Sequence, residues 1–198
     1  MPVIPRAELD RLSGRLIRSI HGVVLEVGAG EGENFRWFAR DVDWIGLEPD
    51  PERRRVLGER AVSRSHSRPP LDARAESIPL EDASVDVVLG THVLCSVNDV
   101  TAAAAEFRRV LRPDGRLVFV EHVAAPRGTW KYALQRAVTP LSVRFDHGCH
   151  WTSDPVPVLE AAGFETVDLR ELEVTSGLGP SVPSILYEGR VSPDGRAG

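Results

Sequence analysis

The stretch Val23-Val24-Leu25-Glu26-Val27-Gly28-Ala29-Gly30-Glu31-Gly32-Glu33-Asn34-Phe35-Arg36-Trp37-Phe38 decides the fold of this chain. It begins with a short apolar run rich in β-branched residues, which predicts a strand buried on both faces. Glycine then occupies every second position, and Phe35 and Phe38 follow at helical spacing, so we expect a helix after the glycines. Such a turn brings bare backbone N–H groups and a helix N-terminus to one point. It is either a site for a nucleoside cofactor or a tight β-to-α turn that binds nothing.

Glu48 favours the cofactor site. It ends a second strand-like run, 42–47, and lies roughly twenty residues past the glycines, where a doubly wound sheet places an acid that accepts hydrogen bonds from ribose hydroxyls. A dinucleotide enzyme favours the spacing G-x-G-x-x-G, whereas this chain has an acid followed by three alternating glycines. The pattern Glu26-x-Gly28-x-Gly30-x-Gly32 resembles motif I of the class I methyltransferases that use S-adenosylmethionine.

The composition limits the remaining possibilities. The 198 residues, 42% hydrophobic and 27% charged, predict one domain with a sizeable core. A net charge of -5 argues against a nucleic-acid partner. No apolar run approaches the ~20 residues that span a bilayer, and no signal peptide opens the sequence. Two cysteines, Cys95 and Cys149, are too few for a disulfide framework, so we expect a cytoplasmic protein.

The order of strand-like and helix-like segments predicts an α/β fold with a doubly wound, mostly parallel seven-stranded sheet, helices on both faces and an antiparallel last strand. We expect one domain over residues 1–198, with a helix at 6–20, a cofactor-binding half at 22–122, a substrate-side half at 123–192 and a flexible tail at 193–198. The expected strands are 23–27, 42–47, 71–75, 85–89, 116–120, 164–172 and 184–187, the last two paired at one edge. Further helices are expected from Pro51, after an Asp99 cap, at 130–138 and, with a side-chain cap, at 153–162.

The resemblance to class I methyltransferases extends over nearly the whole chain. The segment 75–88 resembles the family pattern A-E-x-L-P-x-x-D-x-S-F-D-x-V, and Leu111–Gly115 resembles the turn before its fifth strand. The resemblance implies that the Ala75 N–H faces an adenine ring nitrogen and that Glu76 accepts from the exocyclic amine. Arg74 stands where many relatives carry Asp, so another group can take the role of amine acceptor.

The resemblance implies a site for S-adenosyl-L-methionine at the glycine loop, the acids and the residues after the fourth strand. Its predicted members are Glu26, Gly28, Ala29, Gly30, Gly32, Asn34, Glu48, Pro49, Ala75, Glu76, Thr91, His92 and Leu94.

A narrower resemblance lies in three short segments, 93–97, 121–125 and 148–150. They resemble a methyltransferase-like group whose mammalian members are alkyl thiol S-methyltransferases. Those members carry an N-terminal hydrophobic anchor that this sequence does not show, so we expect no membrane association. The implied activity is methyl transfer to a small molecule, with a thiol as the first choice. The alternatives are O-, N- or C-methylation of a quinone-like, lipid or natural-product acceptor, and a cofactor-binding module without catalysis.

A thiol acceptor needs a proton acceptor near neutral pH. His122, just past the fifth strand, is the first candidate for this catalytic role, and Asp146, His147 and His150 follow without a ranking. The cluster at 146–150 also contains metal-ligand types, but no second cluster at finger spacing completes a zinc site, so we predict no metal. Cys95 is expected to be a small buried hydrophobe in preference to a reactive thiol.

Overall fold

The computed structural model describes residues 1–66, 68–145, 152, 154–175 and 179–192. Within these residues one seven-stranded sheet has the order β1-β6-β7-β5-β4-β2-β3. Its strands are β1 (Val3–Pro5), β2 (Val23–Val27), β3 (Asp43–Leu47), β4 (Val85–Thr91), β5 (Leu111–His122), β6 (Phe164–Thr175) and β7 (Val182–Val191). The predicted flexible tail at 193–198 lies outside the described residues.

The sheet confirms the predicted fold class. Strand β2 pairs in parallel with both β3 and β4, and β4 pairs in parallel with β5, whereas β7 is antiparallel to both β5 and β6. The two last strands do pair with each other, but the edge beside them belongs to β1, which is parallel to β6.

The predicted third strand, 71–75, was wrong. Only Leu71 forms a bridge, to Leu47, through its N–H to Gly46 O and its carbonyl to Glu48 N. The two prolines before Leu71 offer no N–H groups, so the pairing cannot extend backwards along the chain. The seventh strand is instead the short β1, which the sequence reading missed.

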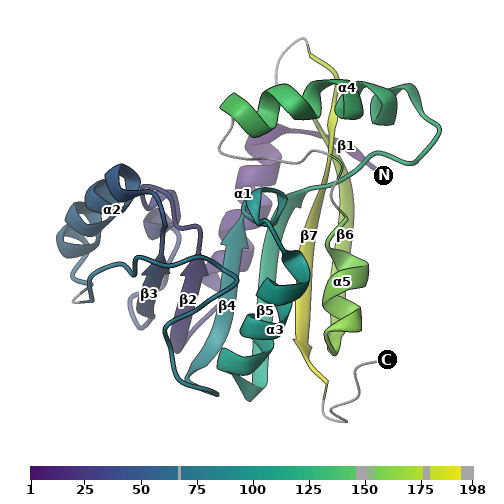
Figure 1. Ribbon diagram of the computed structural model, residues 1–198. Coiled ribbons are helices and arrows are strands. Elements are labelled where there is room, and N and C mark those ends of the chain that lie inside the picture. The colour runs from purple at the N-terminus through teal and green to yellow at the C-terminus, as the bar shows by residue number, and fades with distance from the viewer. Residues whose placement is uncertain (67, 146–151, 153, 176–178, 193–198) are drawn as a thin grey trace.

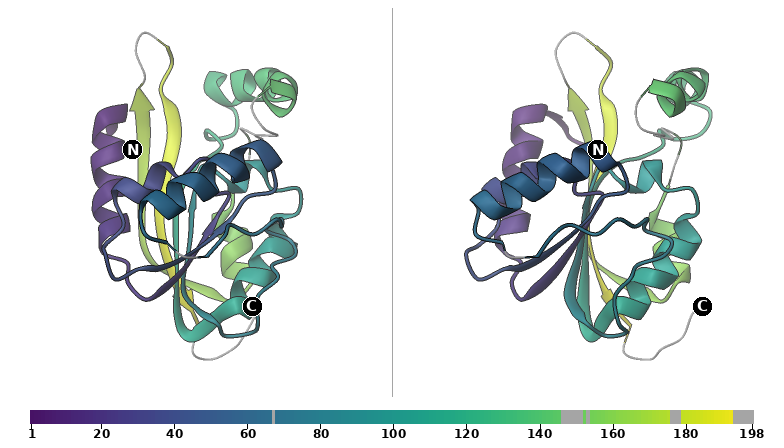
Figure 2. Two further views of the ribbon diagram at one scale, coloured as in Figure 1. Left: turned by 90° about the vertical axis from the view of Figure 1, so that its left-hand side faces the viewer. Right: turned by 60° about the vertical axis from the view of Figure 1, so that its left-hand side comes forward.

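The helices form a layer on each face of the sheet, and Figures 1 and 2 show these layers from three sides. Packing against shared clusters puts α1 and α2 on one face, and α3 and α5 on the other. The helices are α1 (Arg6–Arg18), α2 (Pro51–Ser63), α3 (Val100–Val110), α4 (Trp130–Phe145) and α5 (Val156–Ala161), and η1 (Glu33–Arg36) and η2 (Leu94–Ser96) are 3₁₀ turns. No helix in the described ranges has the length and apolar character to cross a membrane.

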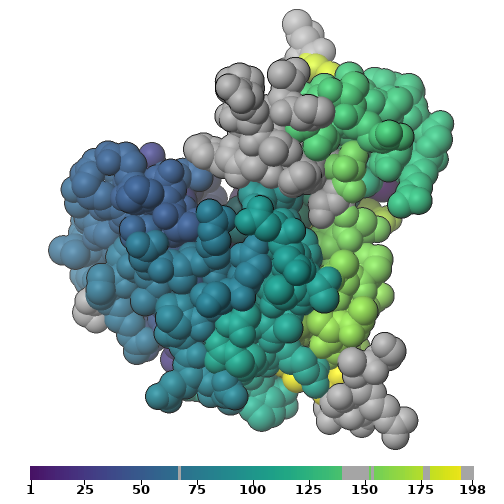
Figure 3. Space-filling view, viewed as in Figure 1, coloured from purple at the N-terminus to yellow at the C-terminus, as the bar shows by residue number. Residues whose placement is uncertain are grey.

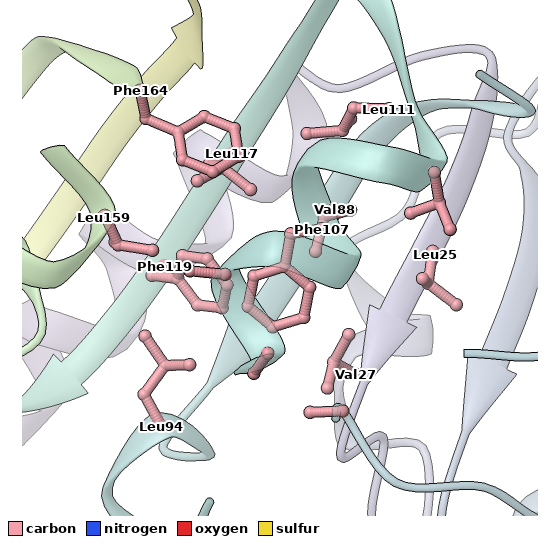
Figure 4. Close-up of a cluster of buried hydrophobic side chains, with 14 of the residues drawn as sticks. Leu25, Val27, Val88, Leu94, Phe107, Leu111, Leu117, Phe119, Leu159 and Phe164 are labelled. Carbon is pink, nitrogen blue, oxygen red and sulfur yellow. The ribbon is translucent and has the colours of Figure 1, made fainter. Parts of the chain in front are cut away.

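Alternate residues of the central strands enter two different cores. Leu25 and Val88 join the cluster with Phe107 on α3, whereas Val24 and Val87 pack on the opposite face. Figure 4 shows the first cluster, in which Phe107 and Phe119 meet between helix and sheet. Burial on both faces explains the continuous apolar runs of these strands.

Three helix predictions need correction. Only the one-turn η1 follows the glycines, because Asn34 is fastened by its side chain to Glu26 and Thr91. Helix α5 begins at Val156, and its N-cap residue Pro155 has no side chain that could accept a hydrogen bond. The backbone of α4 continues through position 140 to 145, beyond the predicted end at 138.

Helix α4 stands at the carboxyl ends of the parallel strands (Figure 1). Its buried Gln135 accepts from Ala125 N at 2.7 Å and donates to Val123 O at 3.1 Å. Lys131 on the same helix donates to Glu173 and Ser181 near β6 and β7. These bonds attach α4 to the sheet at this end, where the candidate site described below also lies.

The burial of Phe107 in the core predicts that its removal destabilises the fold. Phe107→Ala should lower the free energy of unfolding by about 3–5 kcal/mol, because it removes a fully buried ring beside Phe119. Val167→Ala, at a residue that is 59% exposed on β6, is the control and should change it by less than ~0.5 kcal/mol. Urea unfolding measures both, and similar losses for the two variants would contradict this description of the core.

Candidate functional site

A pocket of about 720 Å³ lies where the carboxyl ends of β2, β3 and β4 meet. The glycine loop, the residues after β3, the segment 74–76 and the residues after β4 line it, and Arg6 and His122 complete its wall. In Figure 3, α2 at the upper left and α4 at the upper right rise on either side of this end of the molecule. The pocket is therefore at the edge at which doubly wound sheets bind ligands.

The glycine loop forms one wall of the pocket. Gly28, Gly30 and Gly32 have φ values of 60°, 59° and 87°, the left-handed region that glycine adopts readily. A Cβ on Gly28 would collide with Val93, so the loop passes directly beneath the residues after β4. The glycines thus allow both the turn and the close approach of backbone to whatever fills the pocket.

Glu48 is buried at the pocket wall and is held by backbone donors on both oxygens. Its Oε2 accepts from Gly30 N at 2.9 Å and its Oε1 from Asp50 N at 2.9 Å. Because a carboxylate oxygen has more than one lone pair, each oxygen can accept a further hydrogen bond. The glycine loop and the acid, which are separated in sequence, therefore form one preorganised unit.

Glu26 lies behind the pocket wall. It is fully buried, and its two oxygens accept from Asn34 Nδ2 and from Trp44 Nε1, each at 2.7 Å. Burial raises the pKa of Glu26 to about 7, although both donors act to lower it. Asn34 lines the pocket and also donates to Thr91 Oγ1 at 3.0 Å. The acid therefore orients a pocket residue, where the sequence had suggested a contact of its own.

The other predicted cofactor residues divide in a similar way. Gly32 and Leu94 do not line the pocket: Gly32 packs toward Phe35 and Leu57, and Leu94 belongs to the core. The predicted members that line it are Gly28, Ala29, Gly30, Asn34, Glu48, Pro49, Ala75, Glu76, Thr91 and His92.

Glu76 has a backbone-binding role that the sequence did not indicate. Its Oε1 accepts from Asn98 N at 2.9 Å and from Asp99 N at 3.3 Å, which ties the segment 74–76 to the start of α3. Ala75 beside it is buried and Arg74 is exposed, and all three line the pocket.

The rings of two histidines, His92 and His122, meet in a tilted arrangement at the end of the pocket formed by β4 and β5. The ring centroids of His92 and His122 are 4.3 Å apart, with 32° between the planes. Arg6, from the first turn of α1, brings Nη2 to 3.5 Å from His92 Nε2. Burial first, and then the charges of His122 and Arg6, together lower the pKa of His92 to about 3, so His92 is neutral near pH 7.

Several pocket residues were missed by the sequence reading. Arg6 carried no signal, because only the packing of α1 on the sheet brings it near β4. Cys95, Ser96 and Val97 follow β4 and could have been included by the rule that selected Thr91. Cys95 is 3% exposed, as expected, yet it also borders the pocket.

The other predicted proton acceptors belong to the segment 146–150, which the structure does not describe. Asp146, His147 and His150 lie outside the described residues, and His122 is the one predicted proton acceptor within them.

The sequence matches a known family of domains and is similar to known enzymes. Residues 25–119 match the family described as "Methyltransferase domain". The chain is similar to two human proteins, thiol S-methyltransferase TMT1A (34% identical over 153 residues) and thiol S-methyltransferase TMT1B (35% over 153 residues). The alignments cover 76% and 74% of this chain and 63% and 61% of those proteins, so it spans less than two thirds of their length.

Solved structures share the fold at lower identity. The YcgJ protein from Bacillus subtilis superposes with a TM-score of 0.75 at 20% identity, covering 92% of this chain and 99% of that one. Geranyl diphosphate C-methyltransferase from Streptomyces coelicolor, solved in complex with S-adenosyl-L-homocysteine, gives 0.72 at 15%, covering 93% and 81%. The chain therefore has the class I methyltransferase fold, and its residues 25–119 match a methyltransferase domain. Its similarity to curated proteins is to thiol S-methyltransferases.

Glu48→Ala should weaken binding of S-adenosylhomocysteine roughly ten- to hundred-fold, because charge-assisted hydrogen bonds of this kind contribute ~1.5–3 kcal/mol. Calorimetric titration measures the change. Glu52→Ala is the control, since Glu52 is an exposed acid on α2 that does not line the pocket. Unchanged affinity in a folded Glu48→Ala protein would remove Glu48 from the cofactor site.

Proposed function

We propose that this chain transfers the methyl group of S-adenosyl-L-methionine to the sulfur of a small-molecule thiol. The observation that carries the proposal is the shared pocket: the glycine loop and Glu48 lie at one part of it, and the paired rings of His92 and His122 lie at another. The similarity to thiol S-methyltransferases supports sulfur as the attacked atom.

The residues present fit the proposed cofactor. The left-handed glycines give a ligand direct access to backbone, and among the described residues a Cβ on Gly30 would have only Glu33 within contact distance. Glu48 would accept from the ribose hydroxyls, and Ala75 N–H would face the adenine ring. When bound, S-adenosyl-L-methionine supplies a methyl group already activated on a sulfonium sulfur.

The chain's own contribution is to orient the acceptor and to take its proton. A free thiol has a pKa near ~8.5 and is mostly protonated at neutral pH. We assign the proton to an imidazole nitrogen of His122 as the acceptor sulfur forms its bond to the methyl carbon and the carbon–sulfonium bond breaks. His92 remains neutral beside it and adds no positive charge next to a sulfonium. Val93 and Val97 add apolar side chains to the lining of the pocket.

The direct test is transfer of labelled methyl from S-adenosylmethionine to a panel of small thiols and phenols. The proposal expects methylated thiols and little reaction with phenols. Preferential O-methylation would move the attacked atom to oxygen, and cofactor binding without turnover would favour a module without catalysis. A small-molecule acceptor in place of nucleic acid, and a cytoplasmic location, are part of the proposal and rest on net charge and cysteine content.

His122→Asn should lower methyl transfer at neutral pH by ~10²–10⁴-fold while cofactor affinity stays nearly intact. The wild-type rate should rise with pH until the imidazole is neutral, and high pH should partly rescue the variant because the thiol then ionises without help. Single-turnover rates from about pH 6 to 9 measure both profiles. His21→Asn, at an exposed histidine paired with Asp41, is the control. Parallel profiles for wild type and His122→Asn would rule out His122 as the proton acceptor.

A further inference from the structure

His92 has an unusual backbone conformation for a residue at the reaction end of the pocket. Its φ is 55°, in the left-handed region that side-chain-bearing residues rarely adopt. The chain leaves β4 at Thr91, turns at His92 and enters η2 at Leu94. The ring is partly enclosed, and its Nδ1 is buried without a hydrogen-bond partner among the described residues. Something outside the residue must therefore hold both the turn and the ring.

Glu121 on the neighbouring strand β5 bonds to this turn. Its side chain is fully buried, and its Oε1 accepts from Val93 N at 2.9 Å and from Leu94 N at 3.1 Å. The N–H of Cys95 also interacts favourably with the same carboxyl. One carboxyl group thus serves consecutive backbone donors in the segment that follows His92. The backbone fixes the other side of the turn, where His92 N donates to Val120 O at 2.8 Å.

A purely space-filling role does not account for a carboxyl group at this position. Its Oε2 is buried and has no hydrogen-bond partner in the part of the chain that the structure describes, so the group is only half satisfied there. Burial raises the pKa of Glu121 well above its usual range, which shows that the ionised form is unfavourable there. An apolar side chain would avoid both costs. What an apolar side chain cannot provide is an acceptor for the N–H groups of the turn.

We infer that Glu121 is a positioning residue that holds His92 in its left-handed turn and its ring against His122 in the pocket. The role in methyl transfer rests on the proposed function, whereas the placement of His92 can be measured without it. Without this acceptor, the turn would relax toward ordinary backbone angles, and the His92 ring would leave its enclosed position. The pocket wall beside the proposed methyl acceptor would then lose its shape.

The placement of His92 can be read from its titration. Among the described residues, the ionisable groups beside the His92 ring are Arg6 from α1 and His122 from β5. Glu121 binds the backbone that follows His92, and the Cys95 thiol lies near the His92 carbonyl. In the wild type the His92 pKa should be about 3, because the ring is buried. Burial raises the pKa of Glu121, so it is protonated where His92 titrates, and replacing it removes no charge beside the ring. A rise of the His92 pKa toward the ordinary ~6.5 therefore reports movement of the ring into solvent.

The experiment compares three variants by NMR titration of the six histidines, assigned by single substitutions. Glu121→Gln keeps a carbonyl oxygen for the turn and should leave the His92 pKa low. Glu121→Met has similar length but no strong acceptor, and Glu121→Asp is one methylene too short to reach Val93 and Leu94. Both should raise the His92 pKa toward ~6.5. If Glu121→Met does not fold, Glu121→Asp carries the test.

Methyl-transfer kinetics add a second readout. Glu121→Met should lower kcat roughly ten- to hundred-fold with little change in cofactor affinity, and Glu121→Gln should restore most of it. In a His92→Gly background, where glycine adopts the left-handed turn freely, Glu121→Met should have little further effect on kcat. A lower melting temperature with an unchanged His92 titration in both Glu121→Met and Glu121→Asp would overturn the inference. Absence of thiol methylation by the wild type would instead overturn the proposed function and leave the titration result to stand.

Discussion

The parallel pairing of β2 between β3 and β4 is the constraint on which the site depends. It brings the glycine loop after β2, Glu48 after β3 and Thr91 at the end of β4 to the same edge of the sheet. Both faces of these strands are covered by helices, so each strand is nearly continuous in apolar residues. The polar side chains of the candidate site lie at the carboxyl ends of these strands, where the pocket is.

Three buried carboxyl groups organise the loops at that edge. Glu26 binds Asn34 and Trp44, Glu48 binds the N–H groups of Gly30 and Asp50, and Glu121 binds the N–H groups after His92. Burying a carboxyl costs free energy unless donors surround it, and here the donors are supplied largely by the loops themselves. Each acid therefore gives its loop one defined conformation. Preorganised loops of this kind leave less ordering to be done when a ligand binds.

The sequence predicted most of the strands, because the apolar pattern of a strand is local. The run 23–27 and the acid Glu48 follow from apolar patterning and from spacing. Prediction from the sequence failed where tertiary contacts decide the conformation. The segment after the glycines remains a single turn because Asn34 is bound by Glu26, and β1 forms only because β6 lies beside it. Arg6 reaches the pocket through the packing of α1, which no periodicity can show.

The most direct test of this account is a crystal structure with S-adenosylhomocysteine bound. We expect both ribose hydroxyls to lie within hydrogen-bond distance of Glu48 and adenine to lie against Ala75. We expect the sulfur to face the end of the pocket that holds His92 and His122. A ligand bound elsewhere, or one whose sulfur points away from the two histidines, would contradict it.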